Sequence, residues 1–290
     1  MSKNFFSHIL VQKRQVIARM KARPSSSRLR EHALEIRKMA GPHRLLQALT
    51  FESPCLKIIA EFKRKSPSAG IIRADVSPGD VVGQYERGGA CAISVLTEET
   101  DFGGSIADLR AVRSSTNLPI LRKDFIIDPI QIYEAAVAGA DAVLLIVAAL
   151  DDDVLGDLRE VAEDQLGLDA LVEVHTSVEM RRAVNAGAKV IGVNNRNLQT
   201  FQVSLETSER LIADAPRDRI MVSESGLQDA ESLRRLHAMG FHGFLIGETL
   251  MRASNPEKAL RGLIAKVEAR SATGRIRRGE QVPSATVHRS

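Results

Sequence analysis

Four short strings, GGACAISVL at 88–96, AGADAVLLI at 138–146, AGAKVIGVN at 186–194 and MGFHGFLIG at 239–247, decide the fold of this chain. Each carries a glycine in its first two residues and then runs into an apolar stretch. They recur about every 50 residues, and repetition at a fixed spacing indicates one structural unit used several times. The glycine is typical of a helix end, and the apolar stretch of a buried strand. If one βα unit takes about 25 residues, the strings mark the entry to every second strand.

Outward from these strings, short apolar runs alternate with longer segments of helical periodicity. Ser77-Pro78 and Asp128-Pro129 are typical helix starts, with a capping side chain before a proline at the first helical position. The predicted strands are 57–62, 91–96, 119–122, 141–147, 169–174, 189–193, 219–223 and 243–246. Eight strands in about 215 residues predict an α/β fold, a (β/α)₈ TIM barrel. The alternative, an open doubly wound sheet, normally has a G-x-G-x-x-G turn after its first strand, where this chain reads KRKSPSAG.

The barrel is expected to span residues 51–270 as the catalytic domain. Residues 1–50 are predicted to form a helical extension that packs on it, because apolar residues recur there at helical spacing. These apolar residues are Phe6, Ile9, Leu10, Ile17 and Met20. A cleaved organelle-targeting peptide is the alternative, since residues 1–30 contain no acidic residue. Residues 271–290 form a basic tail without apolar periodicity, which is expected to be disordered.

Composition narrows the class of protein. Of the 290 residues, 44% are hydrophobic and 26% charged, so the chain can bury a full core. The longest mainly apolar run, at 142–150, has less than half of the roughly 20 residues that cross a bilayer. Two cysteines, Cys55 and Cys91, are too few for a disulfide framework, which fits a reducing compartment. We expect a soluble, cytoplasmic protein without a membrane partner.

The net charge of +4 is unevenly distributed. Residues 1–50 contain 11 Lys and Arg against two acidic residues, residues 51–270 contain 25 against 33, and residues 271–290 contain four against one. Basic ends invite an RNA-binding interpretation. Stacking on bases needs aromatic residues interleaved with basic ones, and that pattern is lacking. We therefore expect no nucleic-acid partner.

Charged residues gather where a barrel places its chemistry, at the C-terminal ends of the strands and just beyond them. They are Glu61, Lys63, Lys123, Asp124, Glu173, Arg196 and Glu224. One such charge alone is often a local salt bridge, but several on one rim indicate a site. Crowding of opposite charges is expected to shift their pKa values toward neutrality, as general acid/base catalysis requires.

A second group of residues suits a phosphate. Barrels of this class often bind one with the loops after strands seven and eight and the start of a short extra helix. Those loops read SESG at 223–226 and GETL at 247–250, and Ser66 after the first strand adds a hydroxyl. No metal is predicted, because the seven histidines show no H-E-x-x-H or paired spacing. His175, beside Glu173, is expected behind the site or at the surface rather than as a ligand.

Together these motifs resemble the indole-3-glycerol phosphate synthase family, from the N-terminal helices to about residue 268. The strings that carry the resemblance are IIAEFKRKSPSAG at 58–70, LTEETDFGGS at 96–105, LRKDFIID at 121–128, LVEVHT at 171–176, IGVNNRNL at 191–198, VSESG at 222–226 and LIGETLM at 245–251. The resemblance implies a lyase of tryptophan biosynthesis that needs no cofactor. Its small phosphorylated substrate is 1-(2-carboxyphenylamino)-1-deoxyribulose 5-phosphate, and it releases CO₂ and water. An isomerase of phosphorylated sugars or of phosphoribosylanthranilate is the alternative on the same scaffold.

The resemblance also implies residue roles. Lys123 matches the general acid on the substrate ketone, and Lys63 the residue that contacts the substrate carboxylate and assists the later dehydration. Glu61 and Glu173 match the catalytic glutamates, with Glu173 the expected partner in removing or relaying the ring proton. The other matches are Asn194 and Arg196 to orient the substrate, Glu224 in the polar mouth, Phe102, Phe125 and Leu144 around the anthranilate ring, and Ser66, Ser225, Gly226 and Gly247 at the phosphate.

One position departs from a common form of the family pattern. Glu248 follows Gly247 where a serine is often found. If backbone N–H groups bind the phosphate, this glutamate can point away, so we expect it to lie outside the site. For assembly we expect a monomer or a weak homodimer.

Overall fold

The computed structural model describes residues 5–52 and 55–276, and within them eight parallel strands close into a barrel. The strands are β1 (Lys57–Phe62), β4 (Ala92–Leu96), β5 (Ile120–Lys123), β6 (Ala142–Ile146), β7 (Asp169–Val174), β8 (Val190–Asn194), β9 (Ile220–Glu224) and β10 (Gly243–Ile246). Each pairs with its neighbours in sequence, and β1 also pairs with β10. A short hairpin of β2 (Lys65–Ser66) and β3 (Gly70–Ile71) follows β1. The predicted TIM barrel is confirmed, and the open sheet is excluded.

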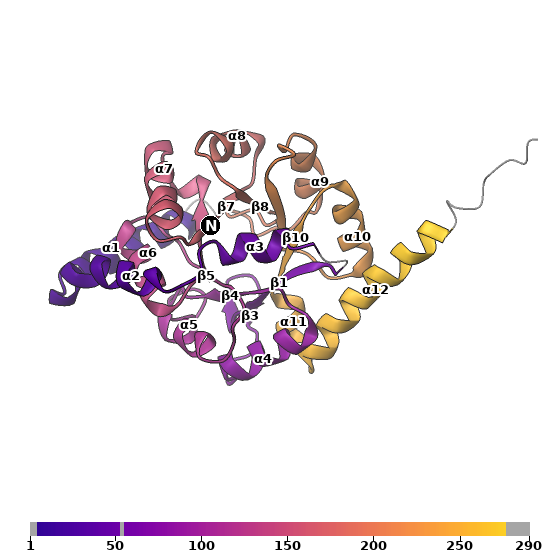
Figure 1. Ribbon diagram of the computed structural model, residues 1–290, viewed down its shortest axis with the longest axis horizontal. Coiled ribbons are helices and arrows are strands. Elements are labelled where there is room, and N and C mark those ends of the chain that lie inside the picture. The colour runs from indigo at the N-terminus through magenta and orange to yellow at the C-terminus, as the bar shows by residue number, and fades with distance from the viewer. Residues whose placement is uncertain (1–4, 53–54, 277–290) are drawn as a thin grey trace, which may run out of the picture.

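Helices alternate with the strands and surround them (Figure 1). They are α4 (Pro78–Gly88), α5 (Ile106–Arg113), α6 (Pro129–Ala138), α7 (Asp152–Glu160), α8 (Ser177–Asn185), α9 (Glu206–Ala213), α10 (Ala230–Met239), the short α11 (Glu248–Arg252) and α12 (Pro256–Ile276). Both predicted helix starts are confirmed, since Ser77 and Asp128 accept hydrogen bonds from backbone N–H groups of α4 and α6. Gly89 and Gly139 end the same two helices with φ of 98° and 93°, which a glycine adopts without strain.

Three strands lie one residue later than predicted. β5, β8 and β9 end on Lys123, Asn194 and Glu224, because the barrel ladder extends to these polar residues. Lys123 aligns with Leu96 of β4, and Asn194 with Glu224. These three side chains are therefore held by strand pairing.

Two apolar layers stabilise the barrel. Along β1, Ile59 belongs to the core inside the barrel, whereas Ile58 and Ala60 belong to the layer between strands and helices. Leu121 and Leu171 join Ile59 inside. This is the period-two alternation of a strand buried on both faces.

The N-terminal extension contacts both ends of the barrel. It consists of α1 (Phe5–Lys21), a 3₁₀ turn, α2 (Leu29–Lys38) and α3 (Arg44–Thr50). α2 lies against α6, at the left of Figure 1. α3 closes the N-terminal end, where Leu45 and Leu49 pack into the interior core. α1 reaches the opposite end, where Nζ of the buried Lys13 lies 2.6 Å from Asp124 Oδ1.

The last helix passes the predicted start of the tail. α12 continues to Ile276, whereas the tail was predicted from residue 271. Residues 277–290 of that predicted tail lie outside the described residues. Within the described residues, none of the helices has both the length and the apolar character that a membrane span requires.

Candidate active site

A cavity of about 730 Å³ opens at the C-terminal ends of the strands. Every residue predicted for the site lines it: Glu61, Lys63, Ser66, Phe102, Lys123, Phe125, Leu144, Glu173, Asn194, Arg196, Glu224, Ser225, Gly226 and Gly247. The structure thus brings together residues from six of the eight strands and from loops between strands and helices, including those after the other two strands, β4 and β10. Their individual roles stay predictions.

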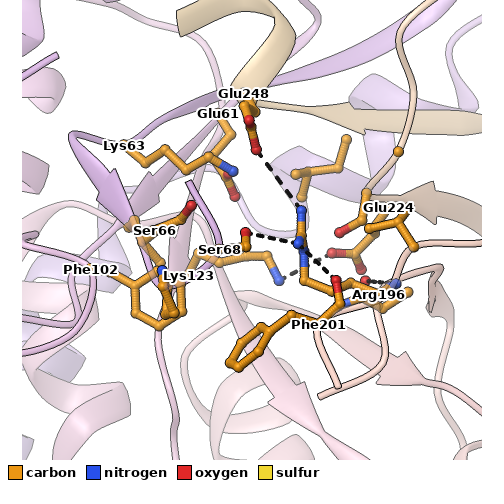
Figure 2. A pocket seen from close by; sticks show the side chains of 18 of the residues that line it. Glu61, Lys63, Ser66, Ser68, Phe102, Lys123, Arg196, Phe201, Glu224 and Glu248 are labelled. Atoms are coloured by element: carbon orange, nitrogen blue, oxygen red, sulfur yellow. Dashed lines mark hydrogen bonds and ion pairs between the residues drawn. The ribbon is translucent and has the colours of Figure 1, made fainter. Parts of the chain in front are cut away.

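Lys123 lies at the centre of the charged group (Figure 2). Its Nζ is 2.8 Å from Glu173 Oε2 and 3.1 Å from Glu224 Oε2. The lysine side chain is 13% exposed and the two glutamates 1% each, so this small opening faces the cavity. Two carboxylates therefore share one cation that a ligand can reach.

The pKa values in this charged group differ in part from the expectation that they are shifted toward neutrality. Burial alone would lower the pKa of Lys123, but the carboxylates of Glu173, Glu224 and Glu61 outweigh it and raise that pKa. Burial opposes ionisation of Glu173, yet Lys123 and His175 lower its pKa. The expectation is wrong for these two residues because each faces opposite charges. It holds for Glu224, where burial raises the pKa to about 7 despite the opposing effect of Lys123.

A second ion pair occupies the wall formed by β1. Lys63 Nζ lies 2.7 Å from Glu61 Oε1. A Cβ atom on Gly247 would come within 2.3 Å of that same oxygen. Gly247 therefore leaves room for the Glu61 carboxylate, in addition to its predicted place at the phosphate.

The apolar wall is aromatic. Phe125 packs against Phe102 with ring centroids 6.3 Å apart, and against Phe6 of α1 at 6.1 Å. Leu144 of β6 completes this side. A planar ring entering here meets aromatic faces and edges, which favour stacked and edge-on contacts.

The loop after β9, one of the two predicted phosphate loops, has an unusual backbone. Ser225 and Gly226 adopt left-handed φ values of 67° and 78° in succession. At Gly226 a side chain would meet Val203 at 2.5 Å. Gly247 directly precedes the short helix α11, and Ser66 of β2 lies across from it at the same cavity. Successive backbone N–H groups of this kind cradle an anion.

Arg196 spans the mouth. Its Nη1 donates to Ser68 Oγ at 2.9 Å in the loop after β1, and to the carbonyl of Phe201 at 3.2 Å. Figure 2 shows the guanidinium between these groups and Glu248. Asn194 accepts a hydrogen bond from the Arg196 backbone N–H at 2.9 Å, which ties the arginine to the end of β8.

Sequence reasoning missed part of the mouth. Phe5 and Phe201 form an edge-on pair at 4.9 Å and line the cavity, and Ser68 contacts Arg196. The expectation that Glu248 points away is wrong. Its carboxylate lines the cavity, because Arg252 at 3.0 Å and Arg196 at 4.0 Å attract it.

Comparison with protein families matches residues 6–263 to indole-3-glycerol phosphate synthase. The chain belongs to the indole-3-glycerol phosphate synthase family. Members are carboxy-lyases of tryptophan biosynthesis with a phosphorylated substrate, which agrees with a cavity that has a charged side, an aromatic side and the predicted phosphate loops. In the part of the chain that the structure describes, no group of three or more His, Cys, Asp or Glu side chains is placed to hold a metal ion.

Solved structures support the fold. The chain is similar to thiamine phosphate pyrophosphorylase from Pyrococcus furiosus, with 17% identity, 74% of this chain and 96% of that one covered, and a TM-score of 0.56. It is also similar to KGPDC from Streptococcus mutans, with 16% identity, 74% and 98% covered, and a TM-score of 0.53. At such identities the likeness establishes the barrel alone.

Proposed function

We propose that this chain catalyses ring closure, decarboxylation and dehydration of 1-(2-carboxyphenylamino)-1-deoxyribulose 5-phosphate to indole-3-glycerol phosphate. The observation that carries the proposal is Lys123, held between Glu173 and Glu224 in a cavity with one aromatic and one anion-binding side. The substrate has an aryl ring, a ketone and a terminal phosphate. The ring matches the aromatic side, the ketone matches Lys123 with its two glutamates, and the phosphate matches the anion-binding side.

Binding comes first in this proposal. The aryl ring packs on Phe102, Phe125 and Leu144, and the Lys63 ammonium contacts the ring carboxylate. The phosphate lies against the backbone of Ser66, Ser225, Gly226 and Gly247. Asn194 and Arg196 orient the chain between them. Anchoring both ends holds the aryl carbon close to the ketone, which supplies much of the rate enhancement.

Ring closure then requires a proton donor at the ketone. As the aryl carbon attacks, the carbonyl π electrons move to oxygen, and the Lys123 ammonium gives that oxygen its proton. The raised pKa of Lys123 keeps it charged at neutral pH, so it also stabilises negative charge as it develops. Attack leaves an iminium in the ring. The electron pair released with CO₂ moves to that nitrogen, so no cofactor is required as an electron sink.

Dehydration needs a base and a second acid. Glu173, whose pKa is lowered, is ionised at neutral pH and takes the proton from carbon as the indole becomes aromatic. The hydroxyl leaves as water with a proton from Lys63. That step leaves Lys63 as a neutral amine, and Glu61, 2.7 Å away, relays a proton from solvent to it and so restores the ammonium.

The absence of tryptophan from the sequence makes the test direct. Purified protein is mixed with the carboxyphenylamino substrate, and indole emission is followed together with CO₂ release. We expect both to rise at equal rates, and Lys123→Ala to lower both rates by about 10²- to 10⁴-fold. A protein that leaves this substrate intact contradicts the proposal, and conversion of phosphoribosylanthranilate instead would identify an isomerase.

A further inference from the structure

His175 lies directly behind the active site, between two carboxylates. Its Nε2 is 3.5 Å from Glu173 Oε1, and its Nδ1 is 3.3 Å from Glu179 Oε2. The backbone N–H of His175 donates to the same Glu179 oxygen at 2.7 Å. The histidine side chain is 14% exposed and Glu173 1%. The three side chains therefore form a chain of contacts from the start of α8 to the cavity floor.

Local sequence builds this arrangement at the start of α8. Thr176 is the N-cap, and its Oγ1 accepts the Glu179 backbone N–H at 3.2 Å. Glu179 occupies the position from which a glutamate usually reaches back to the N-cap backbone. Here it reaches one residue further, to both the backbone and the ring of His175. The cap therefore also fixes how the imidazole is oriented.

The two oxygens of Glu173 face different cations. Oε2 accepts from Lys123 at 2.8 Å, and Oε1 faces the His175 ring. His175 Nε2 is buried and makes no hydrogen bond among the described residues, and Glu173 Oε1 at 3.5 Å is the acidic oxygen that the structure places beside it. A protonated imidazole has two N–H donors, one for each flanking carboxylate.

The charges around the ring favour its protonated form. Glu173 on β7, Glu179 on α8 and Glu224 on β9 act on it, and Lys123 lies beyond Glu173. Burial lowers the pKa of His175, but the hydrogen bond to Glu179 and the nearby carboxylates outweigh it and raise that pKa. In turn, His175 helps lower the pKa of Glu173.

We propose that His175, held by Glu179, is a positioning residue that keeps Glu173 ionised and orients its carboxylate for proton removal. The proposal rests on the proposed function, in which Glu173 is the base. His175 touches no substrate and acts only through Glu173. Without its charge, Glu173 would take up a proton at higher pH and lose its ability to act as a base there.

The kinetic test compares His175→Gln and Glu179→Gln with wild type between about pH 5 and 9. We expect the acidic limb of kcat to move to higher pH by about 0.5–1 unit in His175→Gln, and in the same direction in Glu179→Gln. KM should stay within about twofold, because neither side chain contacts the substrate. His32→Gln, at an exposed histidine of α2, is the matched control and should leave the profile unchanged. A uniform fall of kcat at every pH, with the limb in place, contradicts the proposal.

A second readout is independent of turnover. In NMR titrations of the histidine rings, we expect His175 to titrate above the ordinary value of about 6.5 in wild type and at lower pH in Glu179→Gln. An unchanged titration in that variant means that Glu179 does not hold the imidazole, and the proposal fails. An inactive wild-type protein contradicts the proposed function itself, whereas an active one with an unmoved acidic limb contradicts only the role of His175.

Discussion

At the scale of single residues, Lys123 allows the most decisive test of the proposed function. One ammonium group serves two buried carboxylates, yet it still reaches the cavity. Residue type and position in the sequence were enough to predict Lys123, Glu173 and Glu224 at one rim. Their individual proton affinities were not predictable, because these depend on which atoms touch after folding.

Lys123→Ala should lower kcat by about 10²- to 10⁴-fold, the usual contribution of a positioned acid. The fold should survive, because Glu224, whose pKa is about 7, can bind a proton when the cation is lost. Turnover and circular dichroism measure the two effects, and Lys258→Ala at an exposed site on α12 is the control. Activity within tenfold of wild type would remove Lys123 from the chemistry.

Glu224→Gln should change how stability depends on pH. The folded pKa of Glu224, about 7, lies above the ordinary glutamate value near 4.3, so protonation favours the folded state. That stabilisation is complete below about pH 4.3 and is lost as pH rises through about 7. The Tm of Glu224→Gln minus that of wild type should therefore be greater at about pH 8 than at about pH 5, by a few degrees. Exposed Glu160→Gln is the control, and an equal Tm difference at both pH values contradicts the prediction.

At the scale of elements, strand ends set the geometry of the site. Periodicity and helix caps predicted all eight strands to within two residues at either end, because these signals are local. The contacts across the mouth of the cavity were harder to predict, since Phe5, Phe201 and Glu248 come from separate segments of the chain. No local pattern encodes such a meeting. The close contact beside Gly192 on β8 was equally hard to predict, because the side chain that it faces, Glu224, lies on β9.

Gly192→Ala should impair catalysis more than stability. A Cβ atom there would come within 2.0 Å of Glu224 Oε1, so the carboxylate must move away from its place beside Lys123. We expect kcat to fall by at least about tenfold, since a 1 Å misplacement can cost more. Gly156→Ala on α7, where a methyl group meets nothing within 4 Å, is the matched control. Comparable kcat values for the two variants contradict the prediction.

At the scale of the whole molecule, the basic extension and the acidic barrel are complementary. Lys13 and Lys21 of α1 pair with Asp124 and Asp128 at 2.6 Å and 2.5 Å. Arg44, the first residue of α3, pairs with Asp141 at 2.9 Å. Part of the charge asymmetry in the sequence therefore serves docking within one chain.

Lys13→Met should lower the free energy of unfolding by about 1–3 kcal/mol, because the buried Asp124 loses one of its two cations and keeps Arg122 at 3.2 Å. Urea denaturation measures the change. The double variant Lys13→Met/Asp124→Asn should recover part of it, since the buried carboxylate charge that Lys13 balanced is then gone. A double variant no more stable than Lys13→Met would show that the loss comes from helix packing.

Closure of the barrel through β1 and β10 has a consequence for biosynthesis. Lys57 pairs with Gly243, so β1 has one free edge until the last strand has been made. At about 5–20 residues per second, the ribosome needs roughly 10–40 s to synthesise the roughly 190 residues between them. Throughout that interval a nascent chain presents an apolar strand edge that other chains can pair with. Helper proteins that shield such edges should matter most for this chain during translation, before β10 emerges.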